Sequence, residues 1–386
     1  MLFANISMEN WTIMTKRSPN LLIVRVRAFN QEIILPQRID FLLDEWKYIE
    51  NLKINFLDIQ PYRFFGYYLG YVFAFLFAFP RLIFSRFDFL ILENPYLSIF
   101  SPIGLLKRKV VLAEFVDYYP AMLKRLFQTK RLRYCVAVMI ARIFHHFTTY
   151  ISVESLTAKK TLINLGVPSS KIKIFPVAID TKRIKFSEQG RNNIRRKFEI
   201  SPNFFVIGYL GKMVEYYNLD IILDSVSLIE NKENIILLFV GDGPYRPTLE
   251  KKWKKLRIKK VIFTGTISHS KICDYYSSMD LFIFPLDALA IKIGEILSCG
   301  IPIIVPPGMA QDWIVDGKNG FVTKENTTEG FKDSINNFFS LKSNDIRKIQ
   351  INAKFFAKKN LEKKMIAYRY LDLLQSRYIA RNRETK

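Results

Sequence analysis

Short apolar runs alternate with longer amphipathic stretches along most of the chain. In the N-terminal part the apolar runs cover 21–29, 54–59, 87–95, 109–120 and 148–155, and β-branched residues are frequent in them. Stretches with apolar residues at helical spacing, such as 39–52 and 121–146, lie between these runs. Short strands that alternate with helices indicate βαβ units and a parallel sheet.

The alternation is interrupted at 181–203 and then resumes. This stretch is polar and basic and contains Ser-Pro near its end, which is typical of a connection between domains. After it, apolar runs begin at 204, 234, 260, 281 and 301. The sequence therefore predicts an α/β protein with two Rossmann-like, doubly wound domains, the first over 1–185 and the second over 200–361.

The composition narrows the class of protein. The chain has 386 residues, of which 49% are hydrophobic, and a formal net charge of +23 that favours anionic partners: nucleic acid, acidic lipid or phosphate-bearing substrates.

Three cysteines without a CxxC motif argue against a disulfide framework or a structural zinc site, and favour a reducing compartment. With three histidines, histidine-based metal chemistry is not expected. The N-terminus has no signal-peptide pattern.

An uncharged, aromatic-rich run covers 64–80, between Arg63 and Arg81. It is shorter than the roughly 20 apolar residues of a membrane-spanning helix, and Pro80 ends it. Three interpretations remain open: a buried helix of a globular domain, a segment lying in the plane of a membrane, and a membrane span.

Basic residues gather in two further segments. Residues 120–134 contain no acidic residue, and leucine and phenylalanine alternate with five cations: Lys124, Arg125, Lys130, Arg131 and Arg133. In a helix this pattern is amphipathic and basic, so we expect contact with an anionic membrane surface, the alternative being an ordinary solvated face. The basic run at 250–260 is interpreted as a solvated face.

Polar and glycine residues follow the expected strands of the second half. In doubly wound sheets, ligands bind beyond the carboxyl ends of the strands. Gly211 allows backbone N–H groups to approach an anion, and Lys212 adds a charge. Glu295 is expected in the first turn of a helix, where the helix dipole stabilises a carboxylate. The functional interpretation is that Glu295 accepts hydrogen bonds from ribose hydroxyls.

Taken in order, the blocks over 204–322 resemble those of the family 4 glycosyltransferases, which have the GT-B fold. The blocks are IGYLGK, FVGDGP, KVIFTGTI, the acidic pair Asp287 and Glu295, SCGIPIIV and VDGKNGFV. Residues 151–180 are similar to the end of the family's acceptor domain. The resemblance implies that the two domains face a cleft and that a C-terminal helix within 362–386 crosses back to complete the N-terminal domain.

The resemblance also implies transfer of a sugar from a nucleotide-sugar donor, with retention at the anomeric carbon and without a metal or other cofactor. Glu295 would bind the ribose, Asp287 the hydroxyls of the donor sugar, and Lys212 beside Gly211 the diphosphate. The base would lie near three consecutive residues, Gly265, Thr266 and Ile267. Cations and N–H groups at these places would stabilise the charge that develops on the leaving diphosphate.

Several positions depart from the family pattern. Tyr217 stands where the family has a second basic residue, and Lys292 is expected to supply the missing charge. The glycines that usually follow the first acid are here 288–290, Ala-Leu-Ala. No histidine matches the one usual in the N-terminal domain, and Glu114 and Asp117 occupy that neighbourhood. The candidate catalytic residues are therefore Asp287, Glu295 and Asp117.

These features together favour a glycosyltransferase that is peripheral on the cytosolic face of a membrane. Its acceptor is expected to be lipid-linked or a saccharide. One alternative is a basic nucleic-acid-binding protein, but no recognition-module signature is present, so nucleic acid is not an expected partner. The other alternative is a sugar-binding relative that has lost catalysis.

Overall fold

The chain divides into two compact units. The computed structural model describes residues 20–26, 40–47, 52–59, 66–93, 95–115, 139, 142–230, 232–256, 258–288 and 290–384. Unit 1 comprises Met1–Ala178 and Lys363–Lys386, and unit 2 comprises Ile179–Glu362. Residues 179–185, which the sequence analysis placed with the first domain, lie in unit 2.

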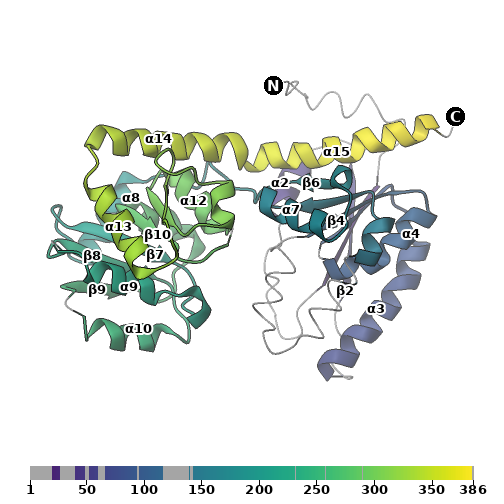
Figure 1. The fold of residues 1–386 in the computed structure, drawn as a ribbon. Coiled ribbons are helices and arrows are strands. Elements are labelled where there is room, and N and C mark those ends of the chain that lie inside the picture. The colour runs from purple at the N-terminus through teal and green to yellow at the C-terminus, as the bar shows by residue number, and fades with distance from the viewer. Residues whose placement is uncertain are drawn as a thin grey trace. The chain divides into compact units, whose positions relative to one another are not determined.

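Unit 1 is built on a parallel sheet of six strands (Figure 1). The strands are β1 (Asn20–Val26), β2 (Lys53–Ile59), β3 (Phe89–Leu92), β4 (Val110–Glu114), β5 (Tyr150–Val153) and β6 (Ile172–Ile174). They are ordered β2-β1-β3-β4-β5-β6, so the chain reverses its direction of winding between β1 and β3. Strands β3 and β4 are buried along their whole length, as in parallel sheets covered on both faces.

Helices cover both faces of this sheet. The helical segments are α2 (Asp40–Trp46), α3 (Gly66–Phe84), η2 (Pro95–Phe100), α4 (Ser101–Leu106), η3 (His145–Phe147), α7 (Leu156–Asn164), η4 (Ser169–Lys171) and α15 (Lys363–Glu384). Helix α15, yellow in Figure 1, packs on one face beside α2. There the indole N–H of Trp46 donates to the carbonyl of Ala367 at 3.0 Å, and the ring of Tyr370 stacks on Phe175. The C-terminal helix therefore completes the core of the N-terminal sheet, as expected.

Residues 66–80 of the aromatic run form most of α3, which continues past Pro80 to Phe84. Ala74, Ala78 and Leu82 are buried against the sheet. The opposite side of the helix leaves Phe77 and Phe84 exposed. Helix α3 thus has a buried face and an exposed apolar face. In the part of the chain that the structure describes, no helix combines the length and the apolar character needed to cross a membrane.

Unit 2 contains a second parallel sheet of six strands. The strands are β7 (Phe205–Leu210), β8 (Ile235–Val240), β9 (Lys260–Phe263), β10 (Leu281–Ile283), β11 (Ile303–Val305) and β12 (Phe321–Val322). Their order, β12-β11-β10-β7-β8-β9, is that of the Rossmann fold, with the winding reversed between β7 and β10. Each expected apolar run of this half became a strand.

The helical segments of unit 2 surround this sheet. They are α8 (Glu188–Lys197), η5 (Glu215–Tyr217), α9 (Asp220–Ser227), α10 (Arg246–Trp253), η6 (His269–Lys271), α11 (Ile272–Ser278), α12 (Ile291–Cys299), η7 (Met309–Asp312), α13 (Thr328–Phe339) and α14 (Ser343–Asn360). The polar stretch 181–203 contains α8 and lies within unit 2, not between the units. Ser187 begins α8, where its hydroxyl accepts a hydrogen bond from the N–H of Gly190.

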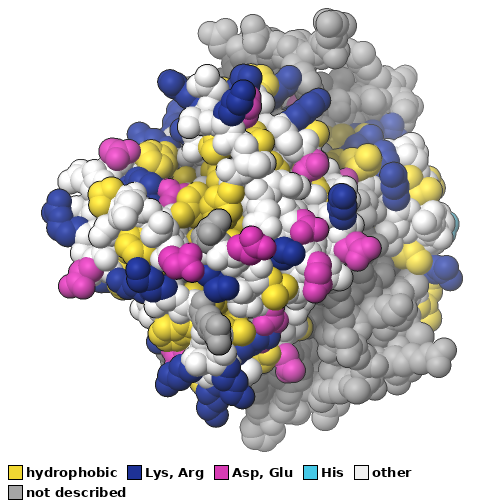
Figure 2. All heavy atoms as spheres, turned by 60° about the vertical axis from the view of Figure 1, so that its left-hand side comes forward, with side chains coloured by type: hydrophobic (Ala, Val, Ile, Leu, Met, Phe, Trp, Pro, Cys, Tyr) yellow, Lys and Arg dark blue, Asp and Glu magenta, His cyan; other side chains and the backbone are white. Residues whose placement is uncertain are grey.

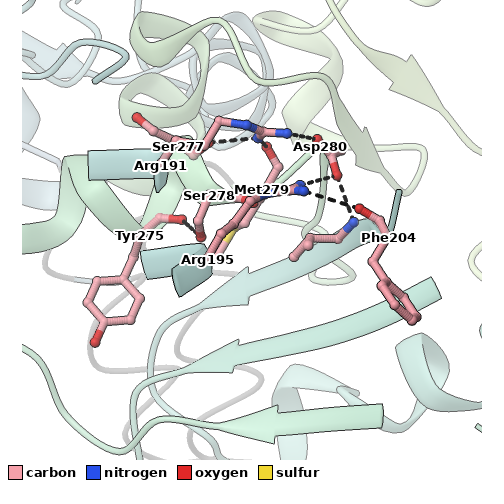
Figure 3. Close-up of polar contacts among 9 residues, drawn as sticks. Arg191, Arg195, Phe204, Tyr275, Ser277, Ser278, Met279 and Asp280 are labelled. Atoms are coloured by element: carbon pink, nitrogen blue, oxygen red, sulfur yellow. Dashed lines mark hydrogen bonds and ion pairs between the residues drawn. The ribbon is translucent and has the colours of Figure 1, made fainter. Parts of the chain in front are cut away.

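Asp280 fastens α8 to the sheet of unit 2 (Figure 3). One carboxylate oxygen accepts from Arg191 at 2.6 Å, and the other accepts from Arg195 at 2.5 Å. The second oxygen also accepts the backbone N–H of Val206 on β7 at 2.8 Å. The guanidinium of Arg195 also donates to the carbonyls of Ser278 and Phe204. Arg191 and Arg195 therefore hold α8 against the sheet of unit 2.

Candidate functional site

The loops that follow β7, β8 and β9 are joined by backbone hydrogen bonds. The N–H of Gly211 donates to the carbonyl of Val240 at 2.8 Å, and the N–H of Met213 donates to that of Asp242 at 2.9 Å. The N–H of Gly241 donates to the carbonyl of Gly265 at 3.0 Å. The first loop is therefore held against the second, and the second against the third, at the carboxyl edge of the sheet.

Glycine is required where these loops meet. The φ of Gly241 is +121°, a backbone conformation that residues with a Cβ rarely adopt. A Cβ at this position would lie 2.1 Å from the carbonyl oxygen of Gly211. The close approach of the first two loops therefore depends on the missing side chain of Gly241.

Lys292 lies against the first loop from the neighbouring helix. It belongs to the first turn of α12, and an ideal Cβ on Gly211 would lie 2.2 Å from its Nζ. The Nζ lies 5.9 Å from the ring centre of Tyr209 and 5.7 Å from that of Tyr217. Burial lowers the pKa of Lys292. The structure thus places a largely enclosed cation between the ends of β7 and β10, where doubly wound sheets bind their ligands.

Glu295 lies one turn further along α12. Its Oε2 accepts a hydrogen bond at 2.8 Å from the hydroxyl of Tyr276 on α11, and 5% of the residue is exposed. Burial raises the pKa of Glu295, while the Tyr276 hydrogen bond and the charge of Lys292 oppose that rise. The sequence analysis was wrong to place Glu295 in the first helical turn, since α12 begins at Ile291. Its local partner is the Tyr276 hydroxyl.

Asp287 holds the adjacent loop. Its Oδ1 accepts the backbone N–H of Met309 at 2.7 Å. Gly308, with φ +134°, passes directly beneath, and a Cβ there would lie 2.1 Å from the same oxygen. The described contact of Asp287 is thus with the turn after β11, and it positions that turn at the same edge of the sheet.

The remaining predicted donor-site residues line the loops. The side chain of Lys212 is exposed, and its backbone carbonyl accepts the hydroxyl of Tyr209 at 2.9 Å. Gly265 forms the bridge with Gly241, and the next two residues, Thr266 and Ile267, are exposed and partly exposed. The structure therefore brings Gly211, Lys292 and Glu295 into one neighbourhood and places Lys212 at its exposed rim.

Two tyrosines complete the site and were not anticipated from the sequence. Tyr276 binds Glu295, and Tyr209 supports both the Lys212 carbonyl and the Lys292 amine. Both rings are buried. In the sequence each is an aromatic residue of an apolar segment, so no local signal distinguished them from ordinary core residues.

The carboxyl edge of the unit 1 sheet also carries charged side chains. Arg25 at the end of β1 pairs with Glu93 after β3, at 3.5 Å, and its guanidinium lies 3.9 Å from the ring centre of Phe56. Glu114, at the end of β4, accepts hydrogen bonds from Ser152 and from Tyr370 of α15. The Arg25–Glu93 pair bridges the point where the winding of this sheet reverses.

Other predicted residues fall outside the described ranges. These are Asp117 and the five cations of the basic segment, Lys124, Arg125, Lys130, Arg131 and Arg133. Over the ranges that the structure does describe, no cluster of three or more His, Cys, Asp and Glu side chains could hold a metal ion.

The second basic run is partly neutralised by neighbours. Lys252 on α10 pairs with Asp224 at 2.6 Å and with Asp220 at 3.2 Å. On the face of unit 2 drawn in Figure 2, basic and acidic side chains are interspersed. This arrangement agrees with a solvated face at 250–260.

A family model matches most of unit 2. Residues 190–355 match the family model described as "Glycosyl transferases group 1". The matched residues all lie in unit 2 and include the three loops and α12. Unit 2 is a group 1 glycosyltransferase domain.

Similar proteins agree with this assignment. An uncharacterized glycosyltransferase of Methanocaldococcus jannaschii is 25% identical over 72% of this chain and 70% of its own length. The alpha-monoglucosyldiacylglycerol synthase of Streptococcus pneumoniae is 24% identical over 43% of this chain and 39% of its own. The structure of Anabaena HepE in complex with UDP aligns with a TM-score of 0.75 and 16% identity, covering 92% of this chain and 100% of that one. The glycosyltransferase domain and unit 1 together thus have the GT-B fold.

Proposed function

We propose that this protein transfers a sugar from a nucleotide-sugar donor to a lipid-linked or saccharide acceptor, with retention of the anomeric configuration. The observation that carries the proposal is the arrangement of Gly211, Lys292 and Glu295 at the reversal point of the unit 2 sheet. An accessible glycine loop, an enclosed ammonium group and a buried carboxylate together match the diphosphate and the ribose of a nucleotide.

Each group has a defined part in this proposal. The ammonium group of Lys292 is largely removed from water, so its attraction for a diphosphate is stronger than at an exposed position. That attraction grows as the bond to the sugar breaks and charge collects on the leaving diphosphate, which lowers the barrier. Glu295, oriented by Tyr276, accepts hydrogen bonds from the ribose hydroxyls. Lys212 adds a second cation at the rim.

One comparison supports a nucleotide-sugar donor. The similar HepE structure holds UDP, which is the leaving group of a UDP-sugar. Retention of the anomeric configuration is proposed from the resemblance of the sequence blocks to the family 4 glycosyltransferases. In this proposal the lysines and the backbone N–H groups neutralise the charge of the diphosphate.

An exposed apolar surface on unit 1 supports an acceptor at a membrane. Phe84 at the end of α3 and Leu106 at the end of α4 are each 83% exposed. The two helix ends are neighbours, because the Nζ of Lys107 donates to the carbonyl of Ser85 at 2.6 Å. Apolar side chains beside a lysine suit the interface of an anionic bilayer. The name of the streptococcal relative, a diacylglycerol glucoside synthase, agrees with a lipid acceptor.

The donor site is tested by calorimetric titration with UDP, GDP, ADP and the matching nucleotide sugars. We expect one nucleotide series to bind the wild-type protein and binding to be lost in Glu295→Ala. The exposed Lys318→Ala variant, on a turn away from this strand edge, should bind as the wild type does. Binding of none of these nucleotides by folded protein would overturn the proposal and favour a relative without catalysis.

The membrane part of the proposal has a separate test. Co-sedimentation with vesicles of anionic lipid should fall in the double variant Phe84→Ser, Leu106→Ser. Phe355→Ser, which changes an exposed phenylalanine on α14 of unit 2, is the matched control and should leave sedimentation unchanged. Equal sedimentation of all three proteins would show that Phe84 and Leu106 do not contribute to membrane binding.

A further inference from the structure

The amine of Lys292 lies over the faces of two aromatic rings. Its Nζ is 5.9 Å from the ring centre of Tyr209 and 5.7 Å from that of Tyr217. Both distances fall within the roughly 6 Å over which a ring face attracts a cation. Among the residues that the structure describes, no carboxylate forms an ion pair or a hydrogen bond with this amine. Aromatic faces therefore take the place that a carboxylate usually has beside a buried cation.

One of the two rings precedes the Gly211 loop and the other follows it. Tyr209 belongs to β7 and is 1% exposed, and its hydroxyl donates to the carbonyl of Lys212 at 2.9 Å. Tyr217 is the last residue of η5 and is partly exposed. An ideal Cβ on Gly211, between them in the chain, would lie 2.2 Å from the Nζ of Lys292. The rings and the loop thus surround the same ammonium group.

The turn around Tyr217 restricts where its ring lies. Asn218 follows it with a φ of +53°, which ends η5, and the side chain of Leu219 is then fully buried. The ring of Tyr216 packs edge-on against that of Tyr217, with the ring centres 4.9 Å apart. The Tyr217 ring is therefore held by its backbone and by a neighbouring ring, independently of Lys292.

A ring face and a carboxylate hold a cation with different consequences. A carboxylate in an ion pair would neutralise the ammonium group and would repel an approaching phosphate. An aromatic face attracts the cation through its quadrupole and carries no net charge. Glu295, one helical turn along α12, favours the charged form of Lys292 without pairing with it. An ammonium group held by rings therefore keeps its charge for an incoming anion.

We propose that Tyr217 is a positioning residue of the donor site. Together with Tyr209, its ring holds the ammonium group of Lys292 beside the Gly211 loop, where the charge meets the diphosphate of the donor. Without this ring, the flexible lysine side chain turns toward water and the loop loses its enclosed cation. The role in binding a diphosphate rests on the proposed function, whereas the contact between the rings and the ammonium group does not.

The contact itself is tested by NMR without any nucleotide. In protein whose lysines carry ¹³C at the ε position, the Lys292 signal is assigned by its loss in Lys292→Arg. Nuclei above a ring face are shielded, so we expect this signal upfield of the exposed lysines. It should move toward them in Tyr217→Leu and stay in place in Tyr217→Phe, which keeps the ring. A Lys292 signal that is unchanged in Tyr217→Leu would overturn the proposal.

The effect on binding is tested by calorimetry with UDP and GDP as probes. We expect Tyr217→Leu to raise the Kd of the bound nucleotide about tenfold, the order of one cation–π contact removed from water. Tyr217→Phe should keep most of the affinity. The matched control is Phe355→Leu, which removes the ring beneath the Lys359 amine on α14 and should bind as the wild type does. Equal Kd values for Tyr217→Leu and the wild type would reject the positioning role.

A double variant shows whether Tyr217 acts through Lys292. If it does, Tyr217→Leu should have no further effect on the Kd in a Lys292→Gln background. An equal loss of affinity in both backgrounds would mean that Tyr217 acts on the nucleotide by another route, and would overturn the proposal. If the wild-type protein binds neither UDP nor GDP, the donor-site proposal and the role in diphosphate binding both fail, while the NMR signal still decides the contact.

Discussion

The hydroxyl of Tyr276 lies 2.8 Å from Oε2 of Glu295, in a buried contact between α11 and α12. The hydrogen bond compensates part of the cost of burying an ionised carboxylate. It also restricts the rotation of the Glu295 side chain. The contact therefore links the position of α11 to the carboxylate that is proposed to bind the nucleotide.

Removing the Tyr276 hydroxyl should impair the site without removing the carboxylate. In Tyr276→Phe, the ionised form of Glu295 loses a donor, so the pKa of Glu295 rises further. We expect weaker nucleotide binding by about tenfold and an acid limb of the binding profile that moves to higher pH. Calorimetry across pH 4.5 to 8 checks both effects. Tyr275→Phe changes the neighbouring residue on α11 and should leave the profile in place; a wild-type profile in Tyr276→Phe would contradict the expectation.

Replacing Glu295 with a neutral isostere should stabilise the protein while it abolishes nucleotide binding. The folded state raises the pKa of Glu295 above its ordinary value of 4.5, so ionisation costs stability as the pH rises through the range above 4.5. Glu295→Gln does not ionise, and its amide oxygen can still accept the Tyr276 hydroxyl. At pH 7 we expect the Tm to rise by about 2–4 °C, the shift that corresponds to about 1 kcal/mol.

The pH dependence distinguishes this cause from a general packing effect. The difference in Tm between Glu295→Gln and the wild type should shrink below pH 4.5, where Glu295 is protonated in both the folded and the unfolded state. Differential scanning calorimetry over this range provides the measurement. A Tm gain that stays constant with pH, or a lower Tm at pH 7, would show that ionisation of Glu295 does not set the stability of α12.

Lys292 should contribute to transfer through its charge. We expect Lys292→Gln to reduce kcat by about 10²–10³, the range seen when one preorganised donor to a developing anion is removed. Lys292→Arg keeps the charge and should recover part of the activity. The exposed Lys318→Ala variant is the control for loss of a positive charge elsewhere. If Lys292→Gln retains wild-type kcat with the preferred donor, the diphosphate is neutralised by other groups.

Gly241 should tolerate no side chain. Gly241→Ala combines an unfavourable φ of +121° with an overlap against the Gly211 carbonyl. Gly317→Ala is the matched control, because its φ is +68° but no atom lies within 4 Å of its ideal Cβ. We expect urea denaturation to show a loss of about 1–2 kcal/mol for the control and a larger loss for Gly241→Ala. Nucleotide binding should decline in Gly241→Ala alone; equal losses in both would mean that the two loops can separate freely.

Asp280 should be a major stabilising residue of unit 2. Its removal leaves two guanidinium groups without their shared carboxylate, and Arg195 is buried. We expect Asp280→Ala to lower the free energy of unfolding by about 3 kcal/mol, as when one partner of a buried ion pair is removed. Asp345→Ala removes an exposed partner of Lys348 and should cost less than about 1 kcal/mol. Chemical denaturation of both variants tests the contrast, which would be refuted by equal losses.

Local sequence patterns were sufficient to predict most strands of the two sheets, although β6 was not predicted and most of the expected helix at 121–146 lies outside the described residues. Five apolar runs of the second half became β7, β8, β9, β10 and β11, because burial on both faces of a parallel sheet requires continuous apolar segments. Gly211 was proposed as a site residue from the strand-to-helix turn that carries it, whereas Glu295, expected in the first turn of a helix, lies one turn further along α12. The charge pattern alone was misleading at 181–203, where the basic residues of α8 pair with Asp280 inside unit 2.

Contacts between residues distant in the sequence depended on the tertiary structure. The amine of Lys292 lies over Gly211, the hydroxyl of Tyr276 reaches Glu295, and the indole of Trp46 bonds the backbone of Ala367. Hydrophobic periodicity reports which face of an element is buried, but it carries no information about which side chain of another element lies opposite. The packing of helices and strands determines these pairs. At this site it places the buried ring of Tyr209 near the amine of Lys292 and the hydroxyl of Tyr276 against Glu295.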